Sequence, residues 1–149
     1  MEPELSEHTL PSPALVTFQR IQAITCRGNL RIRVLADGAL YAQVERGNCA
    51  RGESWSGPWP ARAGYVLSDA DLRALQSMLE SPAFFELPAH ISTLGHDGYR
   101  DEIEVTLGPQ QHQVTVERTE PPLAFAVLRD HLMQLAAPLI EGDQASNAT

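Results

Sequence analysis

The 149-residue sequence has no apolar run long enough to cross a membrane. A membrane-spanning helix needs about 20 consecutive apolar residues, and no run in the chain approaches that length. Residues 1–13 also lack the positive end and the apolar stretch of a signal peptide. We therefore expect a cytoplasmic protein with no membrane partner, although a chain from which an export signal had been removed would begin in the same way.

Clusters of positive charge are missing as well. The chain has 11 Lys and Arg residues against 19 Asp and Glu residues, which gives a net charge of −8. Nucleic acids and anionic membranes attract proteins mainly through basic patches that neutralise phosphate groups. The charge therefore argues against a nucleic-acid partner.

Cysteine is scarce. Cys26 and Cys49 are the two in the chain, which is too few for a disulfide scaffold, and their spacing matches no metal-site pattern. We expect two reduced thiols. In an exported protein a Cys26–Cys49 bridge becomes an alternative, because both residues lie at the ends of segments that we predict to share one sheet.

Recognisable catalytic motifs are also absent. Neither cysteine stands in a nucleophile signature, and no glycine-rich phosphate loop is present. His90, His96 and His112 could in principle hold a metal ion, but their spacing is not that of a known zinc site. We predict a protein that is not an enzyme and has no cofactor and no metal. A metal-dependent enzyme built on these histidines is kept as an alternative hypothesis.

What the sequence does contain is the alternation of apolar and polar residues that is typical of strands. Residues 15–25 are rich in β-branched and aromatic residues, and a slip in the alternation at Arg20 and Ile21 indicates a bulge. Residues 30–45 and 102–117 each predict a hairpin. The first turns at Asp37-Gly38, a pair that suits a tight primed turn, and the second at Gly108-Pro109.

Two segments carry the signals of helices. Ser68 can cap a helix that runs to about Glu80, and its apolar residues recur at helical spacing. Pro121 and Pro122 suit the first turn of a second helix, which we expect to end at Pro138. Between the two helices, the apolar patch at residues 84–87 is expected to plug the core.

The order of elements is β-β-β-α-β-β-α, without the signal of a βαβ crossover. It predicts an α+β fold in which an antiparallel sheet of about five strands has two helices packed on one face. We expect a single domain over residues 14–140 with an irregular loop at 47–66. Residues 1–13 and 141–149 are predicted to be disordered tails.

The loop 47–66 is the most unusual part of the sequence. Between residues 47 and 64 it carries four glycines, two prolines and both tryptophans of the chain, with no periodicity. Trp and Arg are the residue types most enriched at binding hot spots. Arg51, Trp55, Trp59 and Arg62 are therefore the predicted partner-binding residues. The alternative is that both indole rings fold back to cover an open end of the sheet.

About the last 75 residues resemble a known family. The stretches LSDADLRALQSML, FFELP, DGYRDEIEVTL and QHQVTVERTEPPLAFAVLRDHL occur in the order seen in emfourins, small bacterial proteins that inhibit thermolysin-like metallopeptidases such as protealysin. Emfourins lack so long an insertion before the first helix. The resemblance implies a similar fold and, as one use of it, inhibition of a peptidase.

These observations together predict a non-enzymatic protein-binding module with another protein as its partner. Inhibition of a peptidase is the first hypothesis for its role. The alternative is an immunity or antiphage accessory protein, which the net negative charge would steer toward a basic partner.

Overall fold

A computed structural model describes residues 12–22, 29–44, 59–92 and 99–148. They form a seven-stranded sheet, in the order β4-β3-β2-β1-β6-β7-β5, and three helices. The strands are β1 (Ala14–Gln22), β2 (Leu30–Leu35), β3 (Ala39–Val44), β4 (Tyr65–Val66), β5 (His90–Ser92), β6 (Tyr99–Leu107) and β7 (Gln110–Glu117), and the helices are α1 (Asp69–Leu79), α2 (Pro82–Phe85) and α3 (Leu123–Ala148).

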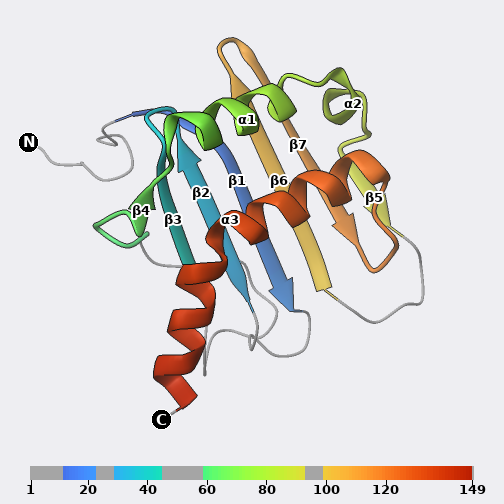
Figure 1. Ribbon diagram of the computed structural model, residues 1–149. Coiled ribbons are helices and arrows are strands. Elements are labelled where there is room, and N and C mark those ends of the chain that lie inside the picture. Colours follow the sequence, from blue (N-terminus) through green and yellow to red (C-terminus); the bar gives the residue numbers. More distant parts are fainter. Residues whose placement is uncertain (1–11, 23–28, 45–58, 93–98, 149) are drawn as a thin grey trace, which may run out of the picture.

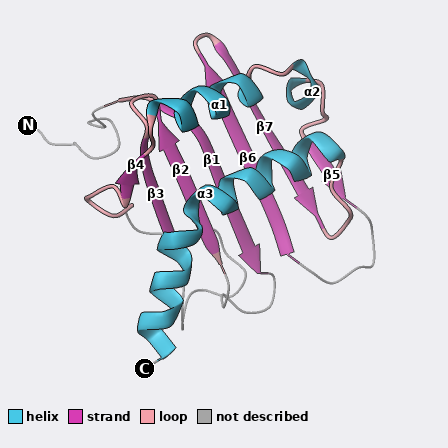
Figure 2. Cartoon of the chain, in the orientation of Figure 1, coloured by secondary structure: helices cyan, strands magenta, loops and turns pink. Residues whose placement is uncertain are grey.

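The helices all lie on one face of the sheet, so the described part of the chain has two layers (Figure 1). Figure 2 shows the same arrangement, with α1 and α3 crossing the near side of the sheet. The core lies between the layers, because alternate residues of each long strand point toward the helices. Its largest fully buried side chains include Phe18, Ile32, Leu75, Ile103 and Phe125.

The predicted α+β class is confirmed, but the predicted details of the sheet are wrong. The sheet has seven strands instead of about five, because β4 and β5 were not predicted. It is also mixed, since β5 pairs with β7 in parallel, whereas the other pairings are antiparallel. β4 lies within the predicted loop 47–66. Strands of two and three residues are too short to show periodicity in a sequence.

The bulge predicted at Arg20 and Ile21 is also wrong. Arg20 pairs regularly with Asp101 and Ile21 with Arg100, and the irregularity of β1 lies instead between Ala14 and Val16. The alternation slips at Arg20 for a different reason. Arg20 stands on the helix-covered face, where its guanidinium meets the buried carboxylate of Asp101.

The first hairpin has the predicted position but a different turn. Gly38 N donates to Leu35 O at 2.9 Å, and only Gly38 has a positive φ, at 93°. A primed turn of the kind predicted would need a positive φ at Asp37 as well. Asp37 instead accepts from the backbone N of Ala39 through its carboxylate, at 3.0 Å. The turn is a type I turn followed by a glycine in the left-handed region.

The two predicted helices are present, and there is a third. Ser68 caps α1 as expected, with its hydroxyl oxygen accepting from Asp71 N at 3.1 Å. The apolar patch at residues 84–87 is partly helical, because α2 begins at Pro82, and Phe84 is buried in the core as predicted.

The predicted end of α3 is wrong. The helix continues through Pro138 to Ala148 and so includes residues 141–148, which the sequence analysis assigned to a disordered tail. A proline inside a helix removes one hydrogen bond and bends the axis, and the last part of α3 leaves the sheet at an angle (Figure 1).

The apolar length of α3 has a structural explanation. Its residues Leu123–Ile140 reach, by length and a mean hydropathy of 1.3, the level at which a helix could cross a membrane, a test that core helices of soluble proteins also pass. Four buried residues of this stretch, Phe125, Leu128, Leu132 and Ala136, belong to the core. One side of α3 therefore packs into the core.

Candidate functional site

The structure describes two of the four predicted partner-binding residues. Trp59 is half-buried and Arg62 is exposed, and both lie in the segment that leads into β4. Arg51 and Trp55 lie outside the described residues, as do Cys26 and Cys49. The site is therefore built from Trp59, Arg62 and their neighbours on β2, β3 and α3.

Trp59 lies against the face of the sheet that the three helices leave uncovered. Arg31 and Arg33 alternate along β2 with core residues and so point away from the helices. The guanidinium carbon of each lies 4.3 Å from the centroid of the Trp59 ring. At this distance a cation is attracted by the electrons of the ring face. These two contacts hold the indole against β2.

Gln43 completes the arrangement. Its side-chain oxygen accepts from Nε and Nη2 of Arg31, at 2.9 and 2.6 Å, and Arg31 is only 5% exposed. We refer to Arg31, Arg33, Gln43 and Trp59 as the Trp59 cluster. Because Arg31 is held by both the ring and the amide, the contacts within the cluster fix its arrangement.

A small apolar patch lies under the indole. Leu35, Ala39 and Tyr41 are buried on this face, and Trp59 packs against them together with Ala14 and Ala63. The ring thus covers part of the helix-free face. The alternative reading, in which both indole rings cover an open end of the sheet, also concerns Trp55, which lies outside the described residues. Trp59 remains half-buried, so some of its surface faces solvent.

A groove runs along the outer edge of β3, beside the Trp59 cluster. It has a volume of about 410 Å³, within the range of ~300–1,000 Å³ typical of ligand-binding clefts. We call it the β3 groove. It is lined by Ala42, Gln43, Val44, Pro60, Arg62, Gly64 and Leu139. Gln43 belongs to both the groove and the Trp59 cluster, which makes the two features one continuous surface.

The far wall of the groove is held by close packing of β4 against α3. A Cβ atom placed on Gly64 would lie 2.1 Å from Cδ1 of Leu139, so any larger residue would require this side chain to move. One residue further on, the Tyr65 hydroxyl donates to the backbone oxygen of Leu135. Burial raises the pKa of Tyr65 above its ordinary value of 10.0, and the nearby negative charge of Asp71 raises it further.

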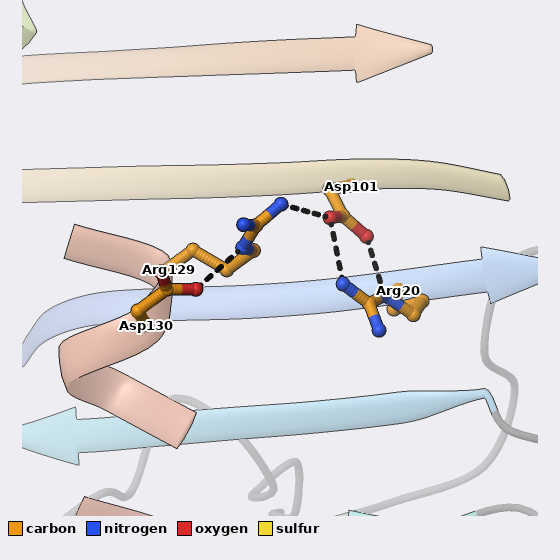
Figure 3. Close-up of polar contacts among 4 residues, drawn as sticks. All are labelled: Arg20, Asp101, Arg129 and Asp130. Atoms are coloured by element: carbon orange, nitrogen blue, oxygen red, sulfur yellow. Dashed lines mark hydrogen bonds and ion pairs between the residues drawn. The ribbon is translucent and has the colours of Figure 1, made fainter. Parts of the chain in front are cut away.

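A second cluster of charged residues lies on the helix-covered face (Figure 3). Asp101 of β6 is 3% exposed and accepts from Nε and Nη2 of Arg20, at 2.9 and 3.1 Å. Arg129 of α3 approaches the same carboxylate at 3.5 Å and bonds Asp130 at 3.0 Å. We call Arg20, Asp101, Arg129 and Asp130 the Asp101 cluster. It joins β1, β6 and α3, and its charges balance, which are properties of a structural crosslink.

The histidines of the metal hypothesis are not brought together. His90 lies on the helix-free face, where its Nε2 is 3.3 Å from the Glu117 carboxylate. His112 lies on the opposite face, where it stacks on Phe85 and its Nε2 is 2.7 Å from the backbone oxygen of Leu87. His96 lies outside the described residues. The described part of the chain contains no group of three His, Cys, Asp or Glu residues placed to hold a metal ion.

Sequence reasoning missed Arg31, Arg33 and Gln43, which it treated as ordinary polar residues of a hairpin. Two arginines on one face of a strand are a weak signal, because such residues usually just face water. What distinguishes them is the contact with Trp59, and that contact depends on the path of the chain.

Comparisons with known proteins add no relative. No protein-family model matches the sequence, and no curated protein matches it either. The resemblance to emfourins therefore stays a prediction.

Proposed function

We propose that this chain is a non-enzymatic protein-binding module whose recognition surface is the Trp59 cluster together with the β3 groove. The observation that carries the proposal is the position of Trp59. Its ring is anchored on two arginines and an apolar patch, yet it is only half-buried. An aromatic side chain held in this way can bury its remaining surface against a partner with little further loss of entropy.

The composition of the surface supports the same proposal. It contains Trp59, Arg33 and Arg62, and Trp and Arg are enriched at the energetic centres of protein interfaces. Ala42, Val44 and Leu139 add apolar surface beside them. The mixture of an aromatic anchor, cations and apolar side chains suits a protein partner better than a small polar metabolite.

The specific role that we propose is inhibition of a peptidase. The resemblance of the last 75 residues to emfourins supports this role, and the β3 groove offers a surface that could meet the rim of an active-site cleft. The test is to assay the full chain at micromolar concentration against a panel of thermolysin-like metallopeptidases. We expect inhibition of at least one enzyme.

Site variants connect the inhibition with this surface. Trp59→Ala removes the anchor and should weaken inhibition at least about 30-fold, which corresponds to a hot-spot loss of about 2 kcal/mol. Arg62→Glu reverses the exposed charge of the groove, and Arg73→Glu is its matched control, because Arg73 is an exposed arginine on α1. We expect the first arginine variant to weaken inhibition and the second to leave it unchanged.

Two results would contradict these proposals. Absence of inhibition across the panel removes the role as a peptidase inhibitor. Inhibition that survives Trp59→Ala unchanged shows that a different surface binds, and the proposed recognition site is then wrong.

A second candidate is an accessory protein of an immunity or defence system with a basic partner. It is favoured by three glutamates of the helix-free face, Glu102, Glu104 and Glu117 on β6 and β7, of which Glu102 and Glu117 form ion pairs with Arg100 and Arg118. A partner bound there should dissociate as salt concentration rises, and Glu104→Gln should weaken binding while Trp59→Ala does not.

A further inference from the structure

The outer edge of β3 is only partly used by the sheet. β4 pairs with Ala39 and Leu40 and with no later residue of β3. Within the described part of the chain, nothing pairs with Ala42, Gln43 or Val44 on this side. The segment 60–64 forms the opposite wall of the β3 groove there instead of a strand.

The direction of the backbone groups on this edge follows from the bonds to β4. Gly64 N donates to Leu40 O at 2.8 Å, and Leu67 N donates to Gly38 O at 2.9 Å. In an antiparallel ladder the N–H and C=O of one residue point to the same side, and the side alternates along the strand. Ala42 and Val44 therefore turn their N–H and C=O groups into the groove, while Gln43 turns its own toward β2.

The side chains around these groups define what can bind. Ala42 and Val44 are small and face the helix layer, where Leu139 closes the groove with another apolar side chain. Arg62 is exposed and has no ion-pair or hydrogen-bond partner among the described residues. The groove thus combines unpaired ladder groups, an apolar floor and one cation.

We infer that the β3 groove binds an extended peptide segment of a partner protein as an added strand. About four residues of the peptide would pair with residues 41–44. An apolar side chain of the peptide would lie over Ala42 and Val44, and a carboxylate, from Asp, Glu or a chain end, would lie against Arg62. Backbone bonds supply affinity in this mode, and the side-chain contacts supply the sequence preference.

This inference rests on the proposed function and specifies how the same surface recognises its partner. We choose an acidic peptide as the bound segment because its carboxylate would complement the positive charge of Arg62 beside the strand. A second copy of the chain paired edge to edge, or another part of this chain, are the competing occupants that the experiment must separate.

The probe is a library of random linear peptides displayed on phage and selected on the full chain, followed by synthesis of the enriched peptide. We expect an apolar residue with an acidic neighbour to be enriched. Replacing the acidic residue by its amide should weaken binding about tenfold, and methylating the peptide nitrogen that faces β3 should weaken it by a similar factor.

Amide hydrogen exchange locates the bound peptide. At saturation, exchange at Ala42 and Val44 should slow at least about tenfold, because their N–H groups gain partners. Exchange at Gln43 should change less, because its N–H already points to β2. Slow exchange at Ala42 and Val44 in the free monomeric chain would overturn the inference, since the edge would then be covered by the chain itself.

A proline variant tests the ladder directly. Val44→Pro removes an outward N–H without breaking a bond to β2, and strand positions of this kind tolerate proline. We expect about tenfold weaker peptide binding, whereas Val44→Ala, which keeps the N–H, should bind nearly as the natural chain does. If Val44→Pro fails to fold, the methylated peptides give the same information on unaltered protein.

The outcomes separate this inference from the proposed function. In one outcome, Trp59→Ala abolishes peptidase inhibition, but saturating peptide leaves amide hydrogen exchange at Ala42 and Val44 unchanged. This outcome keeps the proposed function and overturns strand addition. Enrichment of no peptide, or a dimer that protects the two amides without peptide, also overturns it. Protection of both amides by an acidic peptide supports it even where no peptidase in the panel is inhibited.

Discussion

Two pairs of arginines lie on opposite faces of the same sheet and have different neighbours. On the helix-covered face, Arg20 and Arg129 converge on Asp101, a carboxylate that is 3% exposed (Figure 3). On the helix-free face, Arg31 and Arg33 converge on the half-buried ring of Trp59. One pair surrounds a buried negative charge, and the other supports an aromatic surface.

The comparison indicates that the contribution of an arginine depends more on the group it contacts than on the arginine itself. A carboxylate between two guanidiniums neutralises charge and ties α3 to β1 and β6, so the Asp101 cluster serves the fold. An aromatic ring held by cations keeps part of its surface available, so the Trp59 cluster suits recognition. The predictions below test whether stability and binding divide between the two clusters in this way.

The largest effect should follow loss of the buried charge. Asp101→Asn keeps the shape of the side chain but leaves two arginines without their shared carboxylate. Breaking a buried ion pair by removing one partner costs about 3 kcal/mol, and denaturant unfolding should show a loss of that size. Asp130→Asn is the control, because the Asp130 side chain is 68% exposed, and should cost under about 0.5 kcal/mol. If both variants lose the same unfolding free energy, the Asp101 cluster does not have the structural role that we assign to it.

The Trp59 cluster should matter less to stability. Trp59→Ala loses partial burial and two cation–π contacts, for which we expect about 1 to 2 kcal/mol in the same unfolding experiment. Trp59→Phe should recover much of the loss, since a phenyl ring can also pack on Leu35 and Tyr41. A loss as large as that of Asp101→Asn would show that Trp59 is a core residue, and the contrast between the faces would fail.

The wall of the β3 groove gives a third, smaller test. Gly64→Ala places a Cβ atom on Leu139, whose side chain must move, and we expect a loss of about 1 kcal/mol. Shortening the neighbour should relieve the conflict, so Gly64→Ala combined with Leu139→Ala should cost less than the sum of the two single variants. Additive losses in this double-mutant cycle would mean that the two residues do not touch.

Much of the fold could be predicted from the sequence, because five strands are long enough to show alternation. β1, β2, β3, β6 and β7 have six to nine residues each, and their apolar positions repeat with a period of two. β4 and β5 have two and three residues and owe their existence to a neighbouring strand. The continuation of α3 past Pro138 likewise depends on its context, since local propensity predicts an end there.

The candidate site also has a part that the sequence predicts and a part that depends on tertiary contacts. Composition singled out Trp59 and Arg62, because Trp and Arg are the residue types most enriched at binding hot spots. Their contacts with β2, β3 and α3 are tertiary and leave no local signal. The Asp101 cluster did leave one: Arg20 follows Val16 and Phe18 at strand spacing, and Asp101 precedes Ile103 and Val105 in the same way. Opposite charges at core-facing positions of two strands indicate an ion pair, and the apparent bulge concealed it.

An effect of similar size is expected at Tyr65, which joins the edge of the sheet to α3. Tyr65→Phe removes the hydrogen bond to the backbone oxygen of Leu135 and should cost about 1 kcal/mol near neutral pH. The control is Tyr41→Phe, which removes a hydroxyl group on the helix-free face of the sheet. If Tyr41→Phe loses more unfolding free energy than Tyr65→Phe, the hydroxyl beside the Trp59 cluster contributes more to stability than the one of Tyr65.

The pH dependence distinguishes the Tyr65 bond from simple packing. Folding raises the pKa of Tyr65 above 10.0, so the folded chain holds its phenol proton more tightly than the unfolded chain does. The stabilisation is therefore complete below pH 10 and is lost as the pH rises through the folded-state pKa. The sequence contains no lysine, so no lysine side chain titrates alongside it, and Tyr41 and Tyr99 remain in both proteins. Unfolding free energies of the natural chain and of Tyr65→Phe should thus converge at alkaline pH. If the difference between the two free energies stays constant as the pH rises, α3 does not shield the hydroxyl of Tyr65. The wall of the β3 groove is then packed less tightly than the structure indicates.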